Sequence, residues 1–241
     1  MSSPPSTWRT AYRSFYYATL PADDLPEIRL PFACTALLLI DLQRGFYDPA
    51  PPPADADAVL RADYQRWTPY RERMASTVLP NTRRLLDRFR ADPVASRHIL
   101  YVRIVSLTAD GRGRSLSHAR PGFNNLHFPP GSPGAEILPE VAPLPGEPVL
   151  GKTTDSALTG TRLRLLLANL GIRHVVVAGI FTDQCVSCTV RSLADESFDV
   201  VVVDDACAAA TDELHRQELT IINNLYCQVL TTTETLSALT T

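Results

Sequence analysis

Lysine is almost absent from this sequence. Of its 23 basic residues, 22 are arginine and only Lys152 is lysine. Heavy use of Arg, Ala and Pro is typical of bacterial genomes rich in G and C, and this bias explains why surface lysines are missing. It does not explain why one lysine remains. Lys152 is therefore either a chance survivor or a residue whose amine is needed, and composition leaves both possibilities open.

A charge excess and long apolar runs are also missing. The formal net charge is −3 and the isoelectric point is about 5.9, so neither nucleic acid nor an anionic membrane surface is expected as a partner. No apolar run approaches the roughly 18–20 residues that span a bilayer. Residues 1–20 lack the continuous apolar stretch and the small-residue cleavage site of a signal peptide. We therefore expect a cytoplasmic protein.

Cysteine is scarce and odd in number, with five residues that lie mostly in strand-like or helix-like runs. This pattern favours reduced thiols over a disulfide framework. Cys34, Cys207 and Cys227 are expected to pack as small apolar residues. Cys185 and Cys188 form a C-x-x-C pair, but that motif alone is a weak indication of redox chemistry, since Cys188 can equally pack along a helix.

Apolar runs alternate with helical patterns along the chain. The helical patterns include a possible N-cap at Asn81 and a stop at Gly171. This alternation predicts an α/β fold with three layers, in which helices cover both faces of a six-stranded, mostly parallel sheet. The expected strands are 35–41, 98–106, 147–152, 173–180, 198–206 and 227–234, and the expected helices are 79–91, 158–172, 183–197 and 211–226.

Two stretches interrupt the alternation. Residues 47–59 are too rich in proline for a core and predict an extended loop, and residues 108–148 form a long segment without periodicity, typical of a lid or binding loop. We therefore predict an N-terminal extension over 1–34 and a single domain over 35–241, with a proline-rich insert at about 49–70.

Three reactive side chains follow three of the predicted strands. Asp41 follows the first strand, Lys152 ends the third, and Cys185 lies just past the fourth. In an open parallel sheet, ligands bind beyond the carboxyl ends of the strands, so these three should lie together. A thiol beside a cation and a helix N-terminus becomes a better nucleophile, and a carboxylate can accept its proton and return it to a leaving amine. This set predicts nucleophilic catalysis.

The segments that carry these residues resemble a known family. "LLLIDLQRGF", "GKTTDSALTGTRLRLLLANLGI" and "VVVAGIFTDQCVSCTVRSLADESFDVVVVDDACAA" are similar to the signature blocks of the isochorismatase-like cysteine hydrolases, whose members include nicotinamidases, N-carbamoylsarcosine amidases and biuret hydrolases. The resemblance covers residues from about 35 to 235. It implies the isochorismatase-like, Rossmann-like variant of the three-layer fold, and a homodimer or homotetramer.

The resemblance also implies a role for each site residue. Asp41 would be the general base and later the general acid, Cys185 the nucleophile, and Lys152 the cation that holds the thiolate and orients Asp41. A cis peptide bond between Ile180 and Phe181 would turn the Phe181 N–H toward the Cys185 N–H and create an oxyanion hole. By position in the family, the substrate pocket would include Gln43, Phe46, Trp67 and Tyr70.

The function implied is hydrolysis of a C–N bond in a small amide, ureide or N-carbamoyl compound through a cysteine thioester, with no cofactor. One alternative is a vinyl-ether hydrolase of the isochorismatase type, but members of that type lack the cysteine. Another is a non-catalytic binding domain, which the complete set of three residues disfavours.

A catalytic metal is not expected. The nicotinamidases of the family bind a metal with an Asp-x-His element after the second strand, and here Asp110 has no histidine two positions later. His118 and His127 are expected to face solvent or belong to a lid, and His215 to be structural. Asp204 and Asp205 are interpreted as loop or cap carboxylates.

Overall fold

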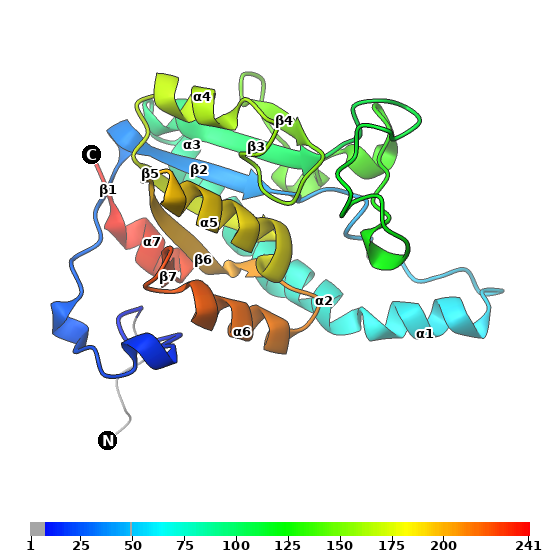
Figure 1. Cartoon of the computed structure of the whole chain (residues 1–241), viewed down its shortest axis with the longest axis horizontal. Helices are drawn as coiled ribbons and strands as arrows, with labels where there is room; N and C mark the ends of the chain where they lie inside the picture. Colours follow the sequence, from blue (N-terminus) through cyan, green and yellow to red (C-terminus); the bar gives the residue numbers. More distant parts are fainter. Residues whose placement is uncertain (1–7, 49) are drawn as a thin grey trace.

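A computed structural model describes residues 8–48 and 50–241. Six parallel strands form its central sheet in the order β4-β3-β2-β5-β6-β7. Every strand expected from the sequence is present, and Figure 1 shows the sheet with helices on both faces, so the predicted three-layer α/β fold is confirmed. The bounds are β2 Thr35–Ile40, β3 Ile99–Ile104, β4 Val149–Lys152, β5 His174–Ile180, β6 Asp199–Ala208 and β7 Gln228–Leu230.

The sheet is apolar on both faces because helices cover both. Along β2, Leu37 and Leu39 point into one core and Leu38 points into the other. The first core lies against α3 (Leu79–Arg90) and α7 (Thr232–Ala238), and the second lies against α4 (Leu163–Asn169), α5 (Ser187–Asp195) and α6 (Asp212–Ile222).

Two predictions from the sequence are wrong, one at Asn81 and one at residues 231–234. Asn81 is not an N-cap, because a π-helical turn at Met74–Val78 leads straight into α3; its side chain donates to the carbonyl of Asp205 at 3.1 Å. The expected strand 227–234 ends at Leu230. Thr231 and Glu234 then form a capping box that begins α7, so local capping overrides the β-branched composition of this segment.

The proline-rich insert is more helical than expected. Its extended part ends at Asp57, whose carboxylate accepts from the Leu60 N–H at 2.8 Å and caps α1 (Ala58–Arg66). The helix α2 (Thr68–Arg73) follows directly. The predicted loop over 47–59 is therefore wrong in its last two residues. Figure 1 shows α1 projecting from the body of the molecule, on the side where the strands end.

Residues 8–34 pack against the end of the domain that lies opposite α1. The short strand β1 (Leu30–Pro31) pairs in parallel with β8 (Leu239–Thr240), so the segment before the sheet is held by the segment after it. The hydroxyl of Tyr12 donates to Asp204 at 2.7 Å. Residues 1–7 of the predicted N-terminal extension lie outside the described residues.

The segment 105–148 contains short 3-10 turns at Gly122–Asn124, Pro133–Ala135 and Pro139–Val141, and its Ile137 forms an isolated antiparallel bridge with Gln43. Among the described residues, none of the helices has the length and apolar character needed to cross a membrane.

Candidate active site

The three reactive residues meet at the carboxyl ends of the strands. The ammonium nitrogen of Lys152, at the end of β4, lies 2.8 Å from Oδ2 of Asp41 and 3.1 Å from Sγ of Cys185. It also donates to the carbonyl of Thr154 at 3.0 Å. All three side chains are buried, with Cys185 only 4% exposed. The ammonium thus donates to two acceptors and forms an ion pair with a third group, Asp41.

Burial and charge set the protonation of this group. Burial raises the pKa of Asp41, while the cation of Lys152 and the neighbouring Cys185 oppose the rise. Burial by itself would lower the pKa of Lys152, but the neighbouring Asp41 and Cys185 outweigh it and the pKa lies above its ordinary value. Burial, and then the carboxylate of Asp41, raise the pKa of Cys185 well above its ordinary value. Burial and the carboxylate of Asp41 thus both favour the neutral thiol of Cys185, whereas burial and Lys152 act on Asp41 in opposite directions.

The backbone around the nucleophile is shaped by two unusual conformations. Asp41 has a φ of 53°, in the left-handed region that side chains rarely adopt, and it directs its carboxylate toward Lys152. Gly179 has a φ of 132°, and a Cβ there would lie 2.1 Å from the carbonyl oxygen of Ile40. Only glycine lets β5 approach the end of β2 this closely.

Cys185 itself lies in a π-helical turn, Thr182–Val186, that follows a cis peptide bond between Ile180 and Phe181. The N–H groups of Gln184 and Val186 both donate to the carbonyl of Phe181, at 3.0 and 3.2 Å. This places the thiol at the N-terminal end of α5, where partial positive charge favours an anion.

Aromatic rings gather around Phe181, shortly before the nucleophile in the chain. Phe181 contacts Phe46, Trp67 and Tyr70, with ring centroids 5.7, 5.9 and 5.2 Å away. Phe123, from the long loop, stacks on Trp67 at 5.7 Å. Phe46, Trp67, Phe123 and Phe181 line a cavity of about 420 Å³. Three of the four predicted pocket residues, Phe46, Trp67 and Tyr70, therefore gather around Phe181, which precedes Cys185 in the chain.

Gln43, the fourth predicted pocket residue, has a structural position instead. It is completely buried, and its side-chain oxygen accepts from the N–H of Ile104 at 2.8 Å. Its amide nitrogen donates to the carbonyls of Ile104 and Gly134 at 3.1 and 3.0 Å. The amide is thus fully occupied in joining the end of β3 to the long loop.

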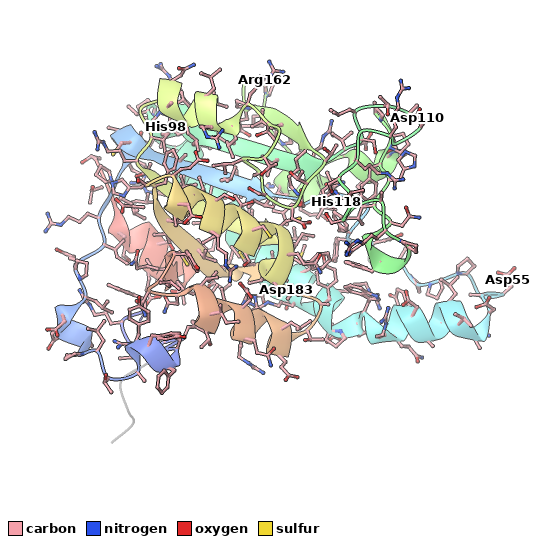
Figure 2. All side chains as sticks on the ribbon, in the orientation of Figure 1. Asp55, His98, Asp110, His118, Arg162 and Asp183 are labelled. Atoms are coloured by element: carbon pink, nitrogen blue, oxygen red, sulfur yellow. The ribbon has the colours of Figure 1, made fainter. Side chains whose placement is uncertain are left out.

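Asp155 near the nucleophile was missed in the sequence, and His118 was named there without its contact to Asp155. Oδ1 of Asp155 lies 3.8 Å from Sγ of Cys185 and 2.9 Å from Nε2 of His118. His118 is buried, so of its two expected roles, facing solvent or belonging to a lid, the first is wrong. In Figure 2, His118 lies where the long loop meets the carboxyl ends of the strands. The position of Asp155, three residues after Lys152, was a signal that could have been used.

The other candidate residues have structural contacts. His215 is buried, with Nδ1 2.7 Å from Oγ1 of Thr182 and Nε2 2.8 Å from Oδ1 of Asp204. Asp205 accepts from both the N–H and the hydroxyl of Thr232 at 2.7 Å, and so caps α7.

All five cysteines, which lie within the described part of the chain, are free thiols. Across residues 8–48 and 50–241, no three His, Cys, Asp or Glu side chains are grouped so that they could hold a metal ion. Catalysis without a metal stays a prediction, for which chelation is the test.

The fold agrees with comparisons to known proteins. The family model "Isochorismatase domain" matches residues 35–234, and the chain belongs to the isochorismatase family. The uncharacterized isochorismatase family protein YddQ of Bacillus subtilis is 30% identical over 147 residues, which are 52% of this chain and 82% of that protein.

A second relative has a named activity. Streptothricin hydrolase of Streptomyces noursei is 31% identical over 173 residues, or 72% of this chain, which spans only 54% of that protein's length. Among solved structures, a putative hydrolase of the isochorismatase family from Chromobacterium violaceum matches with a TM-score of 0.65 and 27% identity, over 89% of this chain and 98% of that one.

Proposed function

We propose that this member of the isochorismatase family is a cysteine hydrolase that cleaves a C–N bond of a small amide, ureide or N-carbamoyl compound. The observation that carries the proposal is the position of Lys152, whose ammonium bridges a buried carboxylate and a buried thiol at 2.8 and 3.1 Å. Membership of a hydrolase family and similarity to streptothricin hydrolase support it.

The first half of the reaction uses Asp41 as a base. Sγ of Cys185 forms a bond to the substrate carbonyl carbon while the thiol proton passes to Asp41. Because burial raises the pKa of Asp41, this carboxylate is a better proton acceptor than an exposed one. The N–H groups of Phe181 and Cys185 would stabilise the developing oxyanion. Asp41 then returns the proton to the nitrogen, the C–N bond breaks, and ammonia or an amine leaves.

The second half releases the acid. Water attacks the thioester while Asp41 accepts one of its protons, the S–C bond breaks, and the thiol of Cys185 regains that proton. Lys152 keeps its proton throughout, because its neighbours raise its pKa above the ordinary value. Its fixed positive charge offsets the negative charge that moves between Cys185 and Asp41.

We assign the body of the substrate to the aromatic cavity. Its volume of about 420 Å³ is at the lower end of common ligand sites, and Asp63 and Arg66 line it together with Phe46, Trp67, Phe123 and Phe181, which suits a small molecule with an apolar or planar portion. The buried cysteine beside Lys152 favours amide cleavage over vinyl-ether hydrolysis, which the related isochorismatase-type enzymes carry out without a cysteine.

The experiment is a screen that measures release of ammonia or amine from primary amides, ureides and N-carbamoyl compounds. Each positive substrate is repeated with Cys185→Ala. Turnover that disappears with Cys185→Ala supports the proposal. Turnover that survives in that variant, or hydrolysis of isochorismate as the main activity, refutes it.

A further inference from the structure

A second carboxylate faces the nucleophile, and the mechanism above does not use it. Oδ1 of Asp155 lies 3.8 Å from Sγ of Cys185, while Asp41 is joined to the same thiol through Lys152. The two carboxylates differ in access: Asp41 is buried, whereas the side chain of Asp155 keeps 36% of its surface exposed. Asp155 is thus the negative group beside the nucleophile that an incoming molecule can reach.

Asp155 is held in place by a residue from the long loop. Nε2 of His118 lies 2.9 Å from Oδ1 of Asp155. The N–H of Ser115 donates to the carbonyl of Thr153 at 3.1 Å, which holds the loop against the residue that follows β4. Within the loop, Oγ of Ser115 accepts from the N–H of His118 at 3.2 Å. The hydrogen bond from His118 keeps the pKa of Asp155 below its ordinary value, against the effect of burial.

Among the described residues, the side chain of His118 makes this one hydrogen bond. Its side chain is 2% exposed, and its other ring nitrogen, Nδ1, has no hydrogen-bond partner among the described residues. A buried histidine whose single side-chain hydrogen bond is with one carboxylate fixes the direction of that carboxylate. We therefore treat His118 as a positioning residue for Asp155.

From this geometry we infer that Asp155 is a specificity-determining residue that binds an N–H or ammonium group of the substrate beside the scissile carbonyl and rejects anionic substrates. The inference rests on the proposed function. When Sγ bonds to the carbonyl carbon, the groups attached to that carbon lie within a few ångströms of Asp155. An N–H donor there gains a charge-assisted hydrogen bond. A carboxylate there meets a like charge, which at about 4–5 Å and an effective dielectric near 20 lowers its reactivity by up to about 10³-fold. Solvent around the partly exposed Asp155 screens the charge and reduces this effect to the order of 10²-fold.

The test compares two reagents of nearly equal size that alkylate Cys185 without turnover. Iodoacetamide carries a neutral amide with N–H donors, and iodoacetate carries a carboxylate. The rate constants for each are measured by mass spectrometry of the peptide that contains Cys185, in the parent and in Asp155→Asn. Asp155 also raises the pKa of the thiol, but that effect changes both rates equally and cancels in their ratio.

We expect the parent to prefer iodoacetamide by about 100-fold or more, and Asp155→Asn to reduce that preference at least about tenfold. His118→Gln, which keeps an N–H donor toward Asp155, should preserve most of the preference, and His118→Leu should lose more of it. Asp110→Asn, which removes an exposed carboxylate of the same loop, is the matched control and should leave the ratio unchanged.

A ratio in Asp155→Asn within about twofold of the parent would overturn the inference, as would a parent in which iodoacetamide fails to label Cys185. If Asp155 had only a structural role, its replacement would slow alkylation by both reagents to the same extent. Because alkylation needs no hydrolysis, the inference can fail while the proposed amidase activity holds. The proposed amidase activity can also fail while the inference holds, because the alkylation ratio is measurable in a protein without amidase activity.

Discussion

Replacement of Lys152 by arginine is the sharpest test of the candidate site. The substitution keeps the positive charge in a protein that uses arginine at its other 22 basic positions. At a surface position it would change nothing. Here the ammonium contacts Oδ2 of Asp41, Sγ of Cys185 and the carbonyl of Thr154 at 2.8, 3.1 and 3.0 Å, and the side chain is among the largest that are fully buried.

The magnitude follows from the room available around that nitrogen. A guanidinium is planar and larger than an ammonium, and it spreads its charge over a fork instead of one point. It can enter this position only by displacing Asp41 or Cys185, and a displacement of about 1 Å in a catalytic group can cost about 10²-fold in rate. That factor corresponds to about 2.7 kcal/mol of transition-state stabilisation. The added volume should also lower the free energy of unfolding by about 1–3 kcal/mol.

The assay is kcat/KM for ammonia or amine release by the purified variant, on the substrate found in the screen. Circular dichroism and urea unfolding establish that the variant is folded. Arg164→Lys is the control for exchanging the two cations, because Arg164 is an exposed partner of Glu196 outside the site. We expect Lys152→Arg to lose at least about 10²-fold and Arg164→Lys to stay within about twofold. A Lys152→Arg enzyme as active as the parent would mean that the ammonium has no role in the reaction.

Four further predictions follow from the same site. Cys185→Ala should fold normally and show no turnover above background; measurable ammonia release would exclude a cysteine mechanism. Activity should survive dialysis against EDTA, whereas loss that zinc or iron restores would reveal a metal. Because burial raises the pKa of Asp41, kcat/KM should decline with acid at a pH above the usual carboxylate range near about 4; a pH profile that stays flat below that value contradicts a base role for Asp41. Gly179→Ala should destabilise the protein by at least about 3 kcal/mol, since its Cβ would meet the carbonyl of Ile40, and a urea midpoint equal to the parent's would contradict this.

The sequence predicts the sheet and the order of the site residues because both depend on local patterns. The run Thr35–Ile40 is apolar on both faces, which is typical of a central parallel strand, and Asp41 follows it directly. Topology then brings the strand ends together, so Asp41, Lys152 and Cys185 could be grouped without knowledge of any contact.

What the sequence does not predict depends on packing or on contacts between distant segments. The threonines around 231–235 favour a strand by composition, but the capping box of Thr231 and Glu234 makes them a helix. The pair His118 and Asp155 is 37 residues apart, and one partner lies in a loop without periodicity. Only the path of that loop brings the two side chains beside Cys185.

The burial of Lys152 has a practical consequence for protein chemistry. Because it is the single lysine, Lys152 carries the one side-chain amine of this protein, and amine-reactive esters reach that amine only when the site opens. The rate of acylation at Lys152 therefore measures how often the strand ends and the loop above them separate. Compared with the rate for a free lysine, it gives the free energy of that local opening directly. A bound substrate analogue should slow the acylation in proportion to its occupancy, which provides a binding assay that needs neither a chromophore nor turnover.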